Sequence, residues 1–115
     1  MKQIFAGVFK DGNRIYTVNL TPGKNVYGEK LVGDKREWDP KRSKLGAAIV
    51  NGIKEMPIKE GNIVLYLGAS TGTTISHVSD IIGKDGFVYG IEFAERVLRS
   101  LIDLSNVRKN IAAIK

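Results

Sequence analysis

The strongest constraint on the fold comes from residues 62–93, which have the pattern of one strand–turn–helix–strand unit. Residues 62–67 are a continuous apolar run between Gly61 and Gly68. A run of this length is too short for a helix and predicts a strand that is buried on both faces. Small residues at 68–72 predict a turn, and the helical spacing of apolar residues at 73–82 predicts a helix. A second apolar run, at residues 87–91, predicts a second strand.

The predicted helix carries its apolar residues on one side and should end at Gly83. We expect the hydroxyl of Thr73 or Thr74 to cap its start. His77 lies one turn inside the helix. Because it is the only histidine and has no predicted partner, we expect it to pack or to face solvent rather than to act as a base.

The turn at residues 68–72 has the features of a ligand site. Glycines let a backbone approach a ligand closely, and the free N–H groups at a helix start point outward. Glu92 directly follows the second strand, twenty-four residues after Gly68, a spacing at which an acid can accept hydrogen bonds from a ribose. The pattern favours a nucleoside-type cofactor, with a plain strand-to-helix connection as the alternative.

Missing motifs narrow the class of cofactor. The dinucleotide fingerprint G-x-G-x-x-G is absent, which weakens the case for an NAD-linked enzyme. No Gly-Lys-Ser/Thr P-loop is present to hold a triphosphate. An adenosine-type ligand without a phosphate chain, such as S-adenosyl-L-methionine, fits what remains.

Composition sets outer bounds on the class of protein. The 115 residues suit one small domain, and with no cysteine and one histidine neither a disulfide nor a metal site is predicted. The sequence lacks a transmembrane run and a signal-peptide pattern, so we expect a soluble, cytoplasmic protein. The net charge is +6, and twelve of the eighteen Lys and Arg residues lie in residues 1–60. This basic excess favours a polyanion such as RNA as a partner, or else is only a solvated surface.

Residues 1–38 are predicted to form an antiparallel sheet. Strand patterns occur at residues 4–9, 14–20, 26–32 and 36–38. Asp11-Gly12 and Gly33-Asp34 lie between these runs and predict two hairpins. We expect Trp38 to anchor this sheet to the rest of the chain or, alternatively, to stack on a base.

A helix is predicted from Asp39, as its N-cap, to Pro57. Its first turns carry the cations Lys41, Arg42 and Lys44, which oppose the helix dipole. Cations at an electrostatically unfavourable position of this kind indicate either a functional role or a solvated helix face.

The remaining elements make the predicted fold class α/β. The spacing of apolar residues from Val97 to Leu104 predicts a helix, and a third strand is predicted to begin at Asn110. Strands that alternate with helices in this way favour a parallel sheet.

Six segments of the chain resemble archaeal members of the fibrillarin family, the RNA 2′-O-methyltransferases of box C/D guide ribonucleoproteins. The segments are residues 25–29, 36–38, 42–49, 65–70, 72–80 and 90–93. Most specific are the Ser-Lys-Leu block and the Gly-Thr-Thr-Ile-Ser-His-Val-Ser-Asp block. The resemblance implies a small antiparallel β amino-terminal region at residues 1–38. It also implies the first part of a Rossmann-like methyltransferase sheet, which binds S-adenosyl-L-methionine, at residues 39–115.

The resemblance also implies roles for individual residues. Lys44 matches a catalytic lysine that would orient the target ribose 2′-hydroxyl, and Lys41 and Arg42 beside it would bind RNA. Glu92 would bind the cofactor ribose, and Phe93 would lie beside the adenosine. The remaining cofactor-binding residues, at the methionine end, are Gly68, Ala69, Ser70, Gly72, Thr73 and Thr74.

The implied activity is methyl transfer to rRNA or tRNA riboses, in a particle with guide RNA, target RNA, a Nop-domain scaffold protein and a kink-turn-binding protein. The family's other catalytic residues, an acid and a second lysine on later strands, have no counterpart in these 115 residues. We therefore expect an amino-terminal half of a fibrillarin that is inert alone and that self-associates, or recruits a partner, through an unpaired strand edge. The alternative is a non-catalytic assembly or RNA-binding module.

Overall fold

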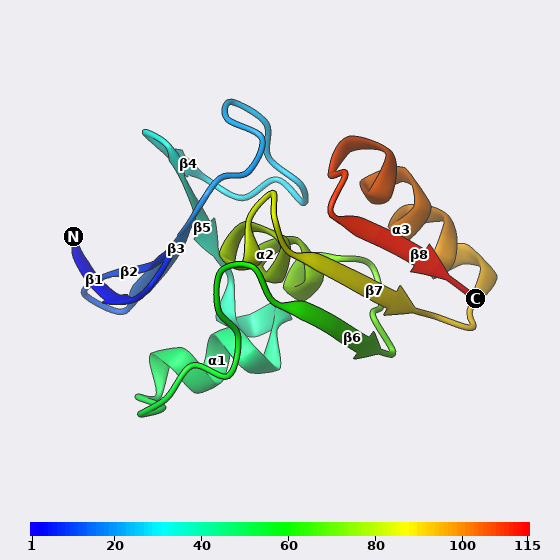
Figure 1. Cartoon of the computed structure of the whole chain (residues 1–115). Helices are drawn as coiled ribbons and strands as arrows, with labels where there is room; N and C mark the ends of the chain where they lie inside the picture. Colours follow the sequence, from blue (N-terminus) through cyan, green and yellow to red (C-terminus); the bar gives the residue numbers. More distant parts are fainter.

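The computed structural model describes all 115 residues and has two β-sheets with a helix between them (Figure 1). The antiparallel sheet has the order β1-β2-β3-β5-β4 and consists of β1 (Lys2–Phe5), β2 (Val8–Asp11), β3 (Arg14–Val18), β4 (Leu31–Val32) and β5 (Lys35–Trp38). The parallel sheet has the order β6-β7-β8 and consists of β6 (Ile63–Leu67), β7 (Phe87–Ile91) and β8 (Ile111–Ile114). The helical elements are the 3₁₀ turn η1 (Pro40–Arg42), α1 (Lys44–Val50), α2 (Thr73–Ile82) and α3 (Glu95–Val107).

This arrangement confirms the predicted α/β class, with an antiparallel sheet followed by a parallel one. The predicted unit at residues 62–93 is present as β6, α2 and β7, and Leu67 of β6 pairs with Ile91 of β7. None of the helices is both long and apolar enough to span a bilayer.

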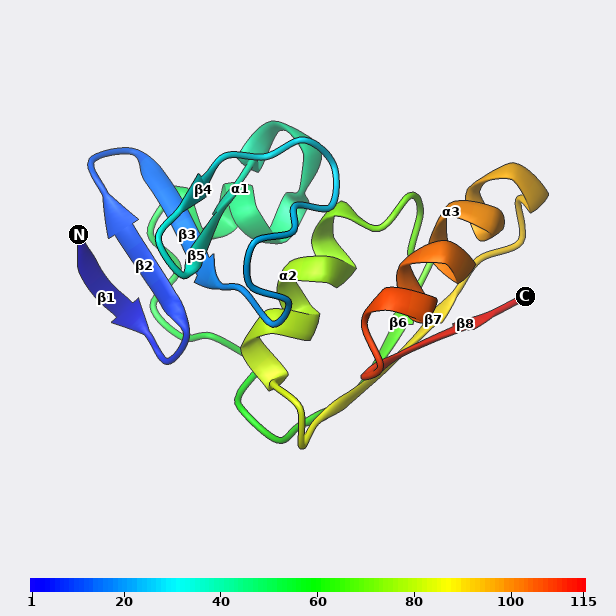
Figure 2. The same cartoon turned by 90° about the horizontal axis from the view of Figure 1, so that it is seen from above.

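Helix α2 lies at the centre of the molecule, between the two sheets (Figures 1 and 2). All ten of its residues are buried, so burial extends beyond the predicted apolar side to the polar residues of the helix. One core packs Ile75 and Ile82 of α2 against Leu101 of α3. The other packs Ile81 of α2 against Trp38 of β5, which confirms the predicted anchoring role of Trp38.

The antiparallel sheet differs from the prediction in two places. The strand predicted at residues 4–9 is a β1–β2 hairpin, because Gly7 adopts a φ of +77° that reverses the chain. The strand predicted at residues 26–32 is reduced to β4, because the Glu29 carboxylate accepts two N–H groups of its own segment and folds it into a turn. Both predicted Asp/Gly hairpins are confirmed.

The helix predicted from Asp39 to Pro57 is shorter and broken. Asp39 is an N-cap, as predicted, but it caps only η1, through a 2.9 Å hydrogen bond from the Lys41 N–H. Ser43 is then extended, with φ −152° and ψ 118°, and α1 starts anew after it and ends at Val50.

This break changes the interpretation of the three cations. Lys41 and Arg42 lie in the last turn of η1, where the dipole of a helical turn favours positive charge. Only Lys44 remains at the start of α1, the position that the dipole disfavours.

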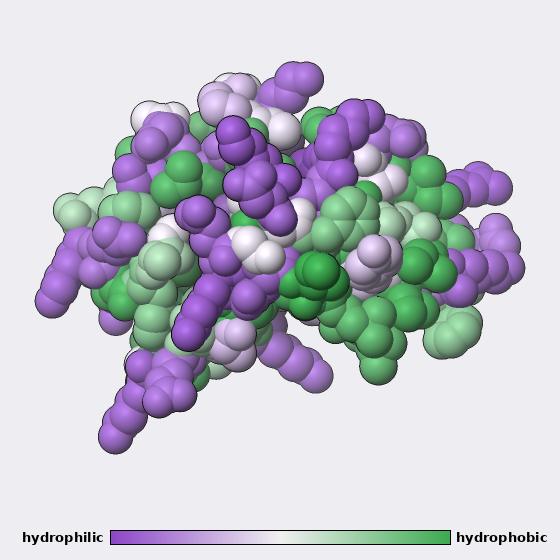
Figure 3. Space-filling model, in the orientation of Figure 1, coloured by the Kyte–Doolittle hydropathy of each residue, from purple (hydrophilic) through white to green (hydrophobic).

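Strand β6 is an edge strand with one uncovered face. Ile63, Leu65 and Leu67 are 78%, 64% and 70% exposed, so the predicted burial on both faces is wrong. The reason is that α2 and α3 both lie on the opposite face of the parallel sheet (Figure 2). Figure 3 shows apolar side chains gathered over this part of the surface. The third predicted strand is confirmed as β8, which forms the other edge.

A network of buried charges joins α2 to the antiparallel sheet. Asp80 of α2 accepts from Nε of Arg36 in β5 at 2.9 Å and from a terminal nitrogen of Arg108 at 2.6 Å. Arg36 also pairs with Glu29. All these side chains are buried, and each charge has a partner of opposite sign.

His77 extends this network as a packing residue. Its Nδ1 lies 2.8 Å from Thr17 Oγ1, its Nε2 lies 2.7 Å from the Tyr27 hydroxyl, and its ring stacks on Trp38. Because the Thr17 hydroxyl donates to Asp80, the Thr17 oxygen must accept from Nδ1–H, and Nε2 accepts from Tyr27. The predicted packing role is therefore confirmed, whereas the expectation that His77 lacks partners is wrong.

Candidate functional site

A cavity lies at the carboxyl end of β6, between the turn that follows this strand and the start of α1. The carboxyl edge of parallel strands is where α/β folds place their ligands. Seven of the predicted site residues line the cavity: Arg42, Lys44, Gly68, Ala69, Ser70, Thr73 and Thr74. The structure thus brings Lys44 to the turn, although the two are far apart in the sequence.

The backbone of the turn requires small residues. Gly68 and Gly72 have φ values of +69° and +107°, and Ser70 is the one non-glycine residue with a positive φ. The N–H groups of Gly68 and Ala69 donate to the Ile91 carbonyl at 2.9 and 3.1 Å, which ties the turn to the end of β7. Apart from Gly68 and its two chain neighbours, no atom lies within 4 Å of where a Cβ on Gly68 would be, so a ligand has room to reach this backbone.

The start of α2 leaves donors free for a ligand. Gly72 occupies the N-cap and no side chain caps the helix, so the predicted Thr73 or Thr74 cap is wrong. Thr73 and Thr74 are instead the first two helical residues, whose N–H groups have no partner inside the helix. Together with the helix dipole, these donors favour an anionic group at this end of the cavity.

Glu92 lies where predicted, directly after β7, and its carboxylate is held by backbone donors. It accepts from the Ser70 N–H at 2.9 Å and from the Phe93 and Ala94 N–H groups at 3.1 Å. The N–H groups of Ala94 and Ser70 contribute most to holding the pKa of this carboxyl below its ordinary value. A carboxylate has about four acceptor positions, so one remains for a ligand.

Four predicted residues do not line the cavity: Lys41, Gly72, Glu92 and Phe93. Phe93 follows Glu92 outside the cavity wall, and its ring is 79% exposed and free to contact a ligand. Lys41 is exposed and does not line the cavity, unlike its neighbour Arg42.

Comparison with known proteins identifies the family. The family model described as Fibrillarin matches residues 1–115. The chain belongs to the fibrillarin family. It is 53% identical to the fibrillarin-like rRNA/tRNA 2′-O-methyltransferase of Thermococcus onnurineus, over 98% of this chain and 54% of that protein. The chain therefore spans about half the length of the curated relatives that it matches.

Solved fibrillarin structures have the same fold. The crystal structure of Aeropyrum pernix fibrillarin with natively bound S-adenosyl-L-methionine is 53% identical, with a TM-score of 0.79, and the match covers 85% of this chain and 44% of that one. Fibrillarin in a complex with Nop5p is 35% identical, with a TM-score of 0.83, and covers 96% and 51% of the two chains. These likenesses confirm the predicted family and fold class.

Sequence reasoning missed Tyr66, Leu67 and Thr71, which line the cavity, and Ser43, which is hydrogen-bonded to the lining residue Thr74. The hydroxyl of Ser43 caps α1 by accepting from the Gly46 N–H at 3.1 Å, and it also accepts from the Thr74 hydroxyl at 2.8 Å. The available signal was a serine between two cations, Arg42 and Lys44, at a potential N-cap.

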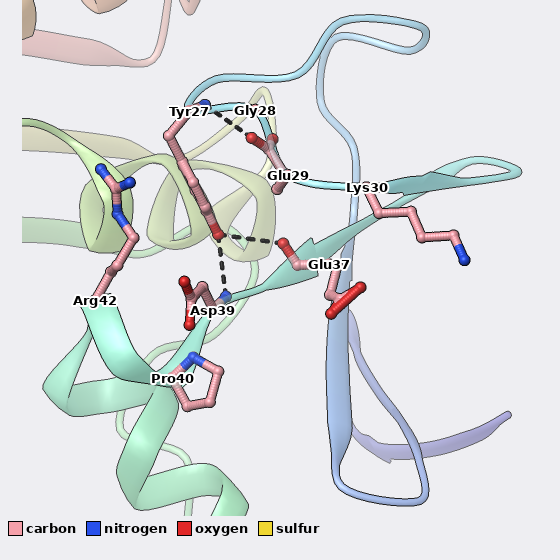
Figure 4. Close-up of a pocket in the computed structure, with 8 residues that line it drawn as sticks. All are labelled: Tyr27, Gly28, Glu29, Lys30, Glu37, Asp39, Pro40 and Arg42. Atoms are coloured by element: carbon pink, nitrogen blue, oxygen red, sulfur yellow. Dashed lines mark hydrogen bonds between the residues drawn. The ribbon is translucent and has the colours of Figure 1, made fainter.

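A second cavity of the fibrillarin chain adjoins the first at Arg42 (Figure 4). The Arg42 guanidinium lies over the Tyr27 ring, 5.0 Å from its centroid. The Tyr27 oxygen accepts from the Asp39 N–H and lies 3.2 Å from the Glu37 carbonyl, so the ring is fixed. Burial is the main cause that raises the pKa of Tyr27 to about 12, which keeps its hydroxyl neutral.

Proposed function

We propose that this chain supplies the cofactor-binding part of an S-adenosyl-L-methionine-dependent RNA ribose 2′-O-methyltransferase that acts on rRNA and tRNA. The observation that carries the proposal is the cavity in which Lys44 shares a wall with the turn at residues 68–74. The activity after which the relatives are named, rRNA/tRNA 2′-O-methylation, supports it.

The residues at the site suit each part of the cofactor. The free N–H groups at the start of α2 fit the carboxylate of the methionine end. The remaining acceptor position of Glu92 fits the ribose diol, and the exposed ring of Phe93 fits the adenine. We assign the methionine end to Gly68, Ala69, Ser70, Gly72, Thr73 and Thr74. When bound, S-adenosyl-L-methionine supplies an electrophilic methyl group on its sulfonium.

The cations beside α1 suit the RNA side of the reaction. The Lys44 ammonium can donate a hydrogen bond to the target 2′-hydroxyl and stabilise the negative charge that develops on that oxygen. Lys41 and Arg42 can neutralise neighbouring phosphates, which would hold the strand in register without reading its sequence. The contribution of the protein is therefore orientation and electrostatic stabilisation.

The proposed assembly is a guide-RNA particle. The fibrillarin complex with Nop5p supports a Nop-domain scaffold protein as a direct partner. We further propose guide RNA and target RNA in the same particle, a kink-turn-binding protein beside them, and a soluble, cytoplasmic location.

The test measures methyl transfer by the native protein assembled with scaffold protein, guide RNA and target RNA. Changing Lys44→Ala should lower the single-turnover rate by about a hundredfold. The dissociation constant for S-adenosyl-L-methionine should stay within about twofold, because Lys44 holds the RNA hydroxyl rather than the cofactor. The matched control is Lys109→Ala, an exposed lysine outside the cavity.

Each outcome assigns a role or removes one. A full rate in Lys44→Ala would remove Lys44 from the catalytic machinery. Failure of the unchanged protein to methylate a guided target, while it still binds RNA and scaffold, would favour the non-catalytic assembly module.

A further inference from the structure

Ser43 is a buried polar residue between two exposed cations. Its exposed fraction is 6%, whereas Arg42 and Lys44 on either side are exposed and line the cavity. Capping α1 does not require this burial, because an N-cap serine works equally well at the protein surface. The environment of Ser43 therefore indicates an interaction beyond the cap.

That interaction is the hydrogen bond from the Thr74 hydroxyl, at 2.8 Å. Thr74 is the second residue of α2 and is itself 9% exposed, so the bond is shielded from water. The bond joins the starts of α1 and α2, and the two bonded residues lie 31 positions apart in the chain. Ser43 thus fixes one helix start to the other, at the wall of the cavity.

Lys44 follows Ser43 directly, so its backbone position depends on this bond. The Ser43 oxygen accepts from Thr74 on one side and from the Gly46 N–H on the other, which restrains both the location and the direction of the first turn of α1. Reactions that depend on orientation are sensitive to displacements of about 1 Å in such groups.

We propose that Ser43 is a positioning residue, which holds Lys44 at a set distance from the cofactor turn through its hydrogen bond with Thr74. This inference rests on the proposed function. Ser43 acts through Lys44 and Thr74, and it has no contact of its own with the reacting groups. Removing its hydroxyl leaves the backbone N–H donors of the turn in place, and it releases the Thr74 hydroxyl and the first turn of α1 with Lys44.

The experiment uses the native protein assembled with its RNAs and scaffold, at saturating RNA. Ser43→Ala should lower the single-turnover methylation rate by about tenfold or more, with the dissociation constant for S-adenosyl-L-methionine within about twofold of the original. Ser43→Thr keeps the hydroxyl and should restore most of the rate. Ser43→Gly is the second variant, because glycine is nearly as good an N-cap as serine and the fold is then retained.

The control for simple loss of a helix cap is Asp39→Ala, which removes the cap of the neighbouring turn η1 and leaves the Thr74 bond intact. This variant should keep its rate. A full rate in both Ser43→Ala and Ser43→Gly would overturn the proposal, as would an equal loss in Asp39→Ala. The unchanged protein serves as the reference. If it does not methylate the target, that result contradicts the proposed function, whereas a loss of rate only in the variants concerns the role of Ser43.

Discussion

At the scale of single residues, Glu92 combines two tasks in one carboxylate. It holds the turn after β6 by accepting from the Ser70 N–H, and in the proposed function its remaining acceptor position would bind the cofactor ribose. The same three backbone donors that lower its pKa also fix its orientation, so in the proposed function a ribose diol would meet a carboxylate that is already ionised and aligned.

Glu92→Ala should weaken S-adenosyl-L-methionine binding by about tenfold or more, because a charge-assisted acceptor and the support of the turn are lost together. Calorimetric titration of the native protein measures this change. The control is Glu95→Ala, which removes an exposed acid that pairs only with Lys115. Unchanged affinity in Glu92→Ala would remove Glu92 from the site.

His77 gives the fold a pH dependence of predictable sign. Burial, and then the charges of Arg36 and Arg108, hold its pKa well below the ordinary 6.5. The unfolded chain therefore takes up a proton at a pH where the folded chain does not, so stability is complete above pH 6.5 and falls as the pH drops below it.

We expect the free energy of unfolding to decrease below pH 6.5 by at most about 1.4 kcal/mol per pH unit from this one group. Urea unfolding at pH 7, 6 and 5 measures the slope, and His77→Gln should lack this contribution. Equal slopes in the two proteins between pH 6.5 and 5 would contradict the assignment of a neutral, buried imidazole.

At the scale of elements, α2 connects the two sheets through Asp80. This carboxylate neutralises Arg36 from the antiparallel sheet and Arg108 from the segment between α3 and β8, and it also accepts from the Leu20 N–H. Removing the Asp80 charge would leave Arg108 without an acid partner and Arg36 with Glu29 alone, and an uncompensated buried charge costs more than the pairing itself contributes.

Asp80→Asn should therefore lower the free energy of unfolding by about 3–5 kcal/mol, because two buried guanidinium groups lose their shared partner. Asp85→Asn, in the exposed turn before β7, should change it by no more than about 0.5 kcal/mol. Denaturant melts of the two variants test the difference. A similar, small effect in both would mean that Arg36 and Arg108 are stabilised by other groups.

Elements whose structure is determined by residues close together in the sequence could be predicted. The hairpins depend on Asp/Gly pairs, the turn at residues 68–72 on small residues, and the place of Glu92 on strand length. The break in the helix after Asp39 could not be predicted in the same way. Its cause includes the partner of Ser43, which lies 31 residues away in the chain. The partners of His77 were missed for the same reason, since Thr17 is 60 residues distant.

At the scale of the whole molecule, the parallel sheet has one covered and one open face. The open face carries Ile63, Leu65 and Leu67 of β6, and the edge of this strand has free hydrogen-bonding groups. The boundary at residue 38 stays a prediction, which is supported by the completion of the antiparallel sheet at Trp38.

A polypeptide of residues 1–115 should self-associate through this face, because burying three large apolar side chains recovers stability. Sedimentation velocity across a range of concentrations measures the association. Leu65→Lys should shift it towards monomer, whereas Lys84→Ala, on an exposed turn, should not. A polypeptide that stays monomeric at all concentrations would show that the open face is stable in water.

The charge network also sets an order of events during synthesis. Arg36 leaves the ribosome 44 residues before Asp80, and Asp80 leaves 28 residues before Arg108. Until α2 has emerged, the Arg36 guanidinium can pair with Glu29, but it lacks Asp80 and the cover that α2 provides. The antiparallel sheet, although it is translated first, can therefore complete its buried charge network only after Asp80 and Arg108 have been made.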